Sequence, residues 1–227
     1  MTNAKGSPSV GNVGGCRCNR DWWDGSCGRA YHLQLSGEHF NLLYSYPGNT
    51  LISYGGDKVK VDIDGYRFPK VEGPRVEPLA IKTISDTQRT YYGDAYVETS
   101  FYSTVRCDIW WSLPQWAEVE GSSETGWWGT EPQFYSDKIK LDESWRFNGI
   151  SVYVSFPPGF SGSGNTVTWS GEDDSGTSYR LVHIYSGIRG ESWVALTSVR
   201  QNSNGSHFFE STHTWVSANA TDGCSTA

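Results

Sequence analysis

The sequence has few of the features that mark helical, membrane-spanning or nucleic-acid-binding proteins. Its 227 residues include a single methionine, and no apolar run approaches the roughly 20 residues of a membrane span. It has no block of basic residues, and its formal net charge is −7, so a phosphate backbone is a poor partner. No segment combines helix caps with a helical hydrophobic period. We therefore expect neither a membrane span nor a nucleic-acid partner.

The known signatures of targeting and catalysis are also missing. Residues 1–15 are polar, small and rich in Gly and Ser, without the apolar core of a signal peptide. We therefore expect no signal peptide, and a final location on a virion or outside the cell after release. The motifs of a nucleophile elbow, a zinc protease and a P-loop are absent, so we predict no enzymatic activity and no cofactor. A hidden pair of glycosidase carboxylates remains open among five glutamates, Glu98, Glu118, Glu120, Glu124 and Glu131.

Alternating hydrophobic runs dominate the rest of the chain, most clearly from Trp145 to Arg200. Within this part, Ile150, Val152, Val154 and Phe156 alternate with Ser151, Tyr153 and Ser155, a period that predicts a strand with the first set on the core face. Turn signals at 157–159, 170–171 and 186–187 separate the runs. This pattern predicts an all-β fold, an antiparallel β-sandwich of jelly-roll type.

Composition divides the chain into two parts. Residues 1–29 are predicted to form a flexible N-terminal arm with an irregular Cys/Gly-rich joint, and residues 30–227 a single β-sandwich domain. Residues 114–144 are expected to form a long aromatic loop, and 201–205 a turn. The remaining predicted strands are residues 31–35, 40–46, 51–54, a hairpin at 58–68, 79–84, 95–113 and 207–216.

The five cysteines divide into one and four. Cys107 shares strand parity with Val97, Phe101 and Val105, which predicts a buried free thiol. The other four, Cys16, Cys18, Cys27 and Cys224, form an even set near the two ends of the chain. They are candidates for disulfides or for a thiolate metal site, with free thiols as a third possibility. If Cys107 lies in the core, Cys224 is expected to find its partner only in residues 16–27.

Adjacent tryptophans are the most unusual feature of the sequence. Neighbouring side chains of a strand point to opposite faces, so one member of each pair must leave the core or be covered from outside. An outward Trp suits stacking on a sugar ring or contact with a protein, and intramolecular packing is the third possibility. The glycan- or protein-contact candidates are Trp22, Trp23, Tyr96, Tyr102, Trp110, Trp116, Trp127 and Trp128.

No metal site is predicted from histidines and carboxylates. His207 and His213 share one face of a predicted strand while Glu210 opposes them, so the three do not converge. The acidic clusters at 62–64 and 172–174 lack the spacing of a calcium loop and are explained by turn chemistry.

The layout of a small arm, a Cys/Gly-rich joint and an aromatic β-domain resembles that of small structural or adhesive virion proteins of tailed bacteriophages. The resemblance extends over the whole chain and rests on layout and composition. It implies a non-enzymatic assembly protein that docks through its arm, forms oligomers with itself or with other virion proteins, and presents its β-domain to protein or cell-surface glycan. The alternatives are a secreted glycan-active enzyme, a carbohydrate-binding module, and a lectin-like or toxin β-sandwich.

Overall fold

The computed structural model describes residues 39–55, 79–108 and 113–226. Contacts between Cα atoms divide the chain into residues 1–38 and 39–227, and the fold below is that of the second unit alone. The predicted N-terminal arm, the strand at 31–35 and the hairpin at 58–68 lie outside the described residues.

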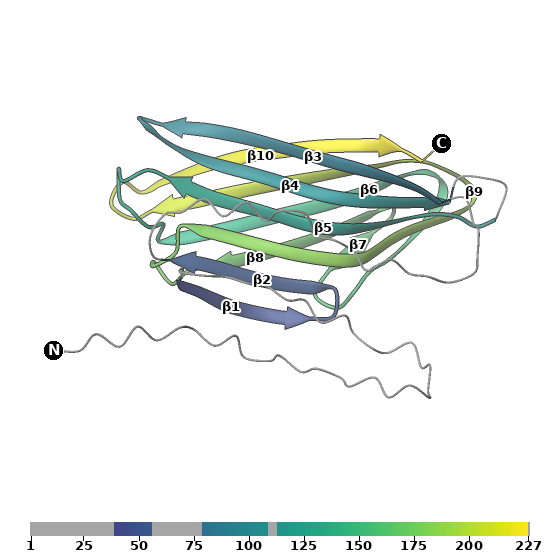
Figure 1. Ribbon diagram of the computed structural model, residues 1–227, viewed down its shortest axis with the longest axis horizontal. Coiled ribbons are helices and arrows are strands. Elements are labelled where there is room, and N and C mark those ends of the chain that lie inside the picture. The colour runs from purple at the N-terminus through teal and green to yellow at the C-terminus, as the bar shows by residue number, and fades with distance from the viewer. Residues whose placement is uncertain (1–38, 56–78, 109–112, 227) are drawn as a thin grey trace, which may run out of the picture. The chain divides into compact units, whose positions relative to one another are not determined.

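The described residues form one antiparallel sheet of ten strands (Figure 1). They contain no helix, and so none long and apolar enough to cross a membrane. The all-β antiparallel prediction is therefore confirmed. The strands are β1 His39–Tyr46, β2 Asn49–Gly55, β3 Leu79–Tyr92, β4 Ala95–Asp108, β5 Gln115–Trp128, β6 Lys138–Ser155, β7 Ser161–Ser163, β8 Thr166–Asp173, β9 Arg180–Phe209 and β10 Thr214–Ser225.

The 30-residue strand β9 organises the sheet, because each of its two edges pairs with two different strands. Along one edge, residues 180–192 pair with β5 and residues 198–209 pair with β10. Along the other edge, residues 180–185 pair with β2 and residues 189–208 pair with β6. The remaining strands extend outward from these neighbours, β4 and β3 beyond β5, β8 and β7 beyond β6, and β1 beyond β2.

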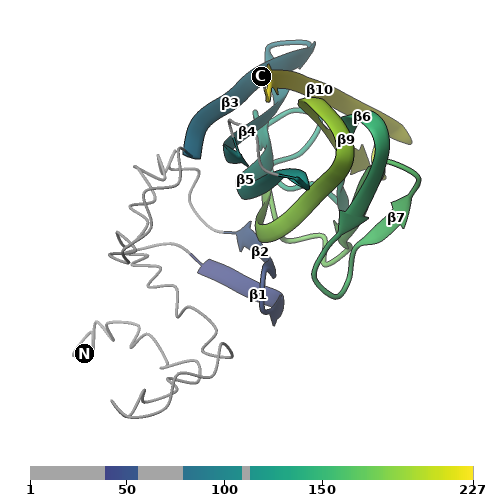
Figure 2. The same cartoon turned by 90° about the vertical axis from the view of Figure 1, so that its right-hand side faces the viewer.

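Side-chain hydrogen bonds bring β3 and β10 together. The backbone amide of Ser85 donates to Asp222, and the amide of Thr221 donates to Asp86. Figure 2 shows β3, β4, β5, β9 and β10 arranged around the core. The two-sheet jelly-roll arrangement is not confirmed, because all ten strands belong to one hydrogen-bonded sheet.

The core follows the alternation of the strands. In β6 every second side chain from Ile139 to Phe147 is buried, and in β8 every second side chain from Val167 to Asp173 is buried. The inward residues of β4, Val97, Phe101, Val105 and Cys107, are all buried, as their shared parity predicted. Burial of such apolar side chains stabilises a fold by about 1.5–3 kcal/mol each.

The predicted loop at 114–144 is wrong, because β5 covers residues 115–128 and β6 begins at Lys138. The glycine that suggested a loop marks close strand approach: a Cβ at Gly121 would collide with the carbonyl oxygen of Tyr102 on β4. The same error affects the turns predicted at 170–171 and 201–205, which lie inside β8 and β9. A Cβ at Gly171 would collide with Trp169, and one at Gly205 with Thr125.

Three other predictions need correction. The turn signal at 186–187 lies within β9, where Gly187 adopts φ 75° and the pairing with β5 shifts register opposite. Ile150 was assigned to the core but is 59% exposed, because register shifts at 148–149 and 150–152 interrupt the alternation; Val152 and Val154 do pack against the core. Residues 207–216 do not form one strand, since β9 ends at Phe209 and β10 starts at Thr214.

Candidate functional site on the outer face of β5, β9 and β6

A row of large side chains crosses three adjacent strands on the outer face of the sheet. Glu191 of β9 is the register partner of Trp116 on β5 and of Tyr153 on β6. Directly paired residues of antiparallel strands lie about 4.5–5.5 Å apart and on the same face. The inward neighbours on β5 and β9, Ala117 and Ile188, are buried, so the row faces away from the core. We call Trp116, Arg189, Glu191 and Tyr153 the outer row.

Arg189 occupies the adjacent outward position of β9 and links the members of the row. Its guanidinium carbon lies 4.5 Å from the ring centre of Trp116, and its Nε lies 2.7 Å from Oε1 of Glu191. Within the described residues, no hydrogen bond engages its two terminal nitrogens. The guanidinium is therefore held in place by the ring and the carboxylate while these two donors remain available.

The side chains of the outer row are accessible to solvent. Tyr153 is 67% exposed, and the side chains of Arg189 and Glu191 are 34% and 37% exposed. Trp193, two residues beyond Glu191 on β9, is 61% exposed and adds a third aromatic ring next to the row. Flat aromatic faces flank a fixed donor–acceptor pair, an arrangement that can stack on a sugar ring and hydrogen-bond its hydroxyl groups.

Two of the predicted contact residues lie in a second aromatic cluster at the other end of β4 and β5. Tyr96 is the register partner of Trp128 on β5 and of Tyr91 on β3, and its ring centre lies 5.5 Å from that of Tyr91. Arg89 stacks on Tyr96 and pairs with Glu98, but the Glu98 side chain is only 5% exposed. The charged pair here is therefore much less open to a ligand than the one in the outer row.

The other aromatic predictions have mixed outcomes. Tyr102 shares the outward face with Tyr96 but lies apart from it, and is 54% exposed. Trp127 is fully buried against Phe209, so the prediction that it contacts a glycan or a protein is wrong. It faces the core because the strand that contains it, β5, replaces the expected loop. Trp22, Trp23 and Trp110 lie outside the described residues.

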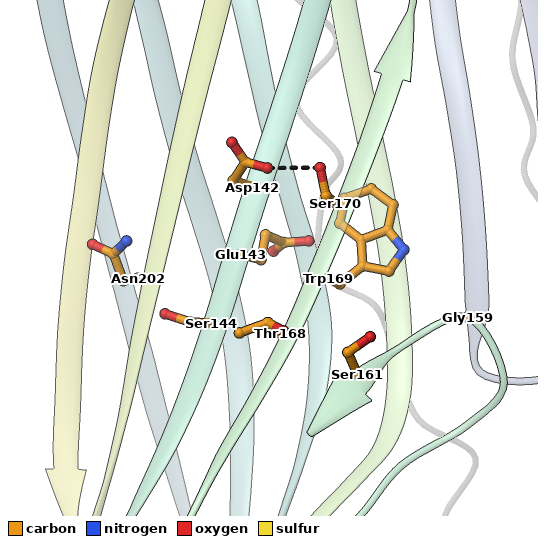
Figure 3. Close-up of a pocket in the computed structure, with 9 residues that line it drawn as sticks. All are labelled: Asp142, Glu143, Ser144, Gly159, Ser161, Thr168, Trp169, Ser170 and Asn202. Atoms are coloured by element: carbon orange, nitrogen blue, oxygen red, sulfur yellow. Dashed lines mark hydrogen bonds between the residues drawn. The ribbon is translucent and has the colours of Figure 1, made fainter. Parts of the chain in front are cut away.

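A polar pocket lies elsewhere on the sheet, over β6, β8 and β7 (Figure 3). Its volume is about 510 Å³, and its lining is dominated by hydroxyl, carboxylate and amide groups of Asp142, Ser144, Ser161, Thr168, Ser170 and Asn202. The Asp142 carboxylate accepts a 2.6 Å hydrogen bond from Ser170 and pairs with Lys140 at 3.0 Å. Its charge is thus already compensated by neighbours, and little apolar surface is available for a ligand to bury against.

The interior holds an ion pair that solvent does not reach. His183 Nδ1 contacts the Glu143 carboxylate, and both side chains are 0% exposed. His183 Nε2 lies 2.9 Å from Oδ1 of Asn49, and the ring of Trp169 stacks on the imidazole at 3.6 Å. Both ring nitrogens are occupied, so this His–Glu pair lacks the access to substrate that a general base needs.

The carboxylates considered for a glycosidase pair have arginine partners. Glu98 pairs with Arg89, Glu120 with Arg106, and Glu124 with Arg180. An adjacent arginine favours the charged form of a carboxyl group, whereas a glycosidase acid must be held protonated. No described glutamate of this group therefore has the environment of a general acid.

The two described cysteines are free thiols. Cys107 is fully buried, as predicted. The expectation that Cys224 meets only residues 16–27 is wrong, since Cys224 packs against the core cluster that contains Cys107. Burial raises the pKa of Cys107 to about 11, with a further contribution from the neighbouring Cys224 thiol. Cys16, Cys18 and Cys27 lie outside the described residues, so the disulfide and metal alternatives among them stay predictions.

Histidines and acidic residues form no metal-binding group within the part of the chain that the structure describes. His207 is buried and bonded to Thr125 and Ser136, while Glu210 and His213 are exposed in the turn before β10. The three residues are therefore separated by burial as well as by strand direction.

Comparison with known proteins adds no relative: no family model, curated protein or solved structure matches the chain. Of the outer row, sequence reasoning selected only Trp116. The alternation of Ser151, Tyr153 and Ser155 did place Tyr153 on the wet face. Arg189 and Glu191 gave no signal, because their position beside Trp116 depends on the register between β5 and β9.

Proposed function

We propose that residues 39–227 form a non-enzymatic adhesive domain that binds glycan through the outer row. The observation behind this proposal is the alignment of Trp116, Glu191 and Tyr153 across three strands, with Arg189 held between ring and carboxylate. Aromatic rings supply the apolar faces that stack on sugar rings, and the ion pair supplies ordered hydrogen-bonding groups. The strands fix the spacing of all four side chains.

The charged centre of the row favours glycan over protein as the partner. The centres of protein–protein interfaces are depleted of charged residues, and burying an ion pair under apolar groups carries a desolvation cost. Sugar hydroxyls can hydrogen-bond both Arg189 and Glu191, which offsets that cost. The compensated state of Asp142 and the inaccessible Glu143–His183 pair support a binding role without catalysis.

The virion setting and the oligomeric state belong to the same proposal. The separation of residues 1–38 from the β-domain is consistent with an arm that docks on a neighbouring subunit. Strand β1 exposes Leu42, Leu43 and Tyr46, and residues 39–55 contain no Asp, Glu, Lys or Arg. An exposed, uncharged edge strand favours association between sheets. Light scattering coupled to size exclusion tests this part: a Leu42→Lys, Leu43→Lys variant should be less associated than the wild type.

A glycan array tests the function itself. The wild-type chain should bind a defined subset of glycans, and Trp116→Ala and Tyr153→Ala should each reduce that binding at least tenfold. Trp215→Ala is the matched control, because Trp215 is a 50% exposed tryptophan on β10, outside the row. Absence of binding, or binding that depends on Trp215 and not on Trp116, would contradict the proposal.

A further inference from the structure

We infer that the ligand of the outer row is an uncharged oligosaccharide that contacts the protein through at least two sugar rings. The inference rests on the proposed glycan binding and adds the class of ligand. Two features of the row lead to it, the spacing of its aromatic rings and the balance of its charges.

The spacing sets the minimum length of the ligand. Trp116 and Tyr153 lie on strands that flank β9, and both are register partners of Glu191. Neighbouring strands lie about 4.8 Å apart, so the two aromatic positions are separated by roughly 10 Å across the sheet. A single pyranose ring is too small to stack on both. A ligand that uses both aromatic side chains must extend across the strands with one ring over each.

The charges around the row disfavour an acidic sugar. Arg189 already pairs with Glu191, and Glu118 is its register partner on β5. Arg106, the register partner of Glu118 on β4, pairs with Glu120. These two arginines and three glutamates leave a net charge of −1 (2 − 3) on this face, within a chain of formal charge −7. A carboxylated or sulfated glycan would meet like charge without an unpaired cation to bind.

The ion pair instead suits two neighbouring hydroxyl groups. A hydroxyl can donate a hydrogen bond to the second carboxylate oxygen of Glu191, and its neighbour can accept one from a terminal nitrogen of Arg189. Both side chains are about one-third exposed and are oriented by each other and by Trp116 before any ligand arrives. Binding therefore orders few side chains, which lowers its entropic cost.

Calorimetry with defined sugars tests the inference on the full chain. The uncharged probes are cellohexaose, chitohexaose and mannohexaose with their monosaccharides, and the acidic probe is a hexamer of galacturonic acid. We expect one or more of the uncharged hexamers to bind at least tenfold tighter than its own monosaccharide and than the acidic hexamer. The Trp215→Ala variant should bind like the wild type, and Trp116→Ala should bind at least tenfold more weakly.

A charge variant separates this inference from the proposed function. Glu191→Gln frees Arg189 from its partner, so it should weaken binding of the uncharged hexamer and strengthen binding of the acidic one. Trp116-dependent binding that prefers the acidic hexamer, or that is equally tight for a monosaccharide, would overturn the inference and leave the proposed function standing. Binding that is absent for all probes, or independent of Trp116, would overturn both.

Discussion

Glu143 of β6 and His183 of β9 form an ion pair with both side chains fully buried. The hydrogen bonds around the imidazole define its protonation. Asn49 donates from Nδ2 to the carbonyl of Pro158, so its Oδ1 accepts from His183 Nε2, which must carry a proton. The second proton lies between Nδ1 and the Glu143 carboxylate. The pair as a whole is neutral, which is why the core can hold it beside the Trp169 ring.

Removing the charge of Glu143 should destabilise the fold strongly. Glu143→Gln leaves His183 without its anionic partner in the core, and breaking a buried pair in this way costs about 3–5 kcal/mol. Urea unfolding of the variant measures the loss. Asp142→Asn is the control, because Asp142 is a neighbour with a partly exposed ion pair, and such pairs contribute about 0–1 kcal/mol. Equal losses for the two variants would contradict the buried pair.

A methyl group at Gly205 should also destabilise the protein. An added Cβ would collide with the side chains of Thr125 and Thr99, two buried residues that are hydrogen-bonded to each other. Overpacking of this kind costs about 1–3 kcal/mol. Ser206→Ala, at the next residue of β9 with an exposed hydroxyl, should change the unfolding free energy by no more than about 0.5 kcal/mol. A Gly205→Ala variant of wild-type stability would show that β9 does not approach β5 as described.

These glycines explain how much of the fold could be predicted from the sequence. Alternation correctly indicated the strand class, the burial of Cys107 and the wet face of Tyr153. Glycines such as Gly121 and Gly205 suggested turns, but they lie inside strands where another chain segment approaches too closely for a Cβ. Only the three-dimensional register reveals such contacts. The same register brings Arg189 and Glu191 beside Trp116, so most of the candidate site was beyond prediction.

Acid should weaken the fold partly through Asp173. Burial disfavours its charged form, but hydrogen bonds from Ser178 and the backbone amide of Ser175 outweigh burial and hold the pKa of Asp173 below its ordinary value. A carboxyl group with a lowered folded-state pKa contributes stability above the unfolded pKa of about 3.9, and loses it as pH falls through the folded pKa. Asp173→Asn should therefore be less stable than the wild type at neutral pH. The gap should narrow below about pH 4 in urea unfolding; a constant gap would contradict the assignment.

The two described thiols should differ in reactivity. Cys107 is fully buried with a pKa of about 11, whereas Cys224 is only partly buried, and burial raises its pKa as well. Alkylation of the native protein followed by peptide mapping should modify Cys224 before Cys107, which should react only after unfolding. A Cys107 peptide labelled in the native state would place that residue outside the core. A peptide joining Cys224 to residues 16–27 would contradict the free thiol and restore the expectation drawn from the sequence.

The central claim, that glycan binds on the outer row, is tested most directly by nuclear magnetic resonance. The isotopically labelled chain is titrated with the tightest-binding sugar, and the perturbed backbone and indole resonances are mapped onto the sheet. We predict that the shifts concentrate on the Trp116 indole, on residues 189–193 of β9 and on Tyr153. Shifts concentrated instead at Asp142 and Asn202 in the polar pocket, or at Tyr96 and Trp128, would contradict the account.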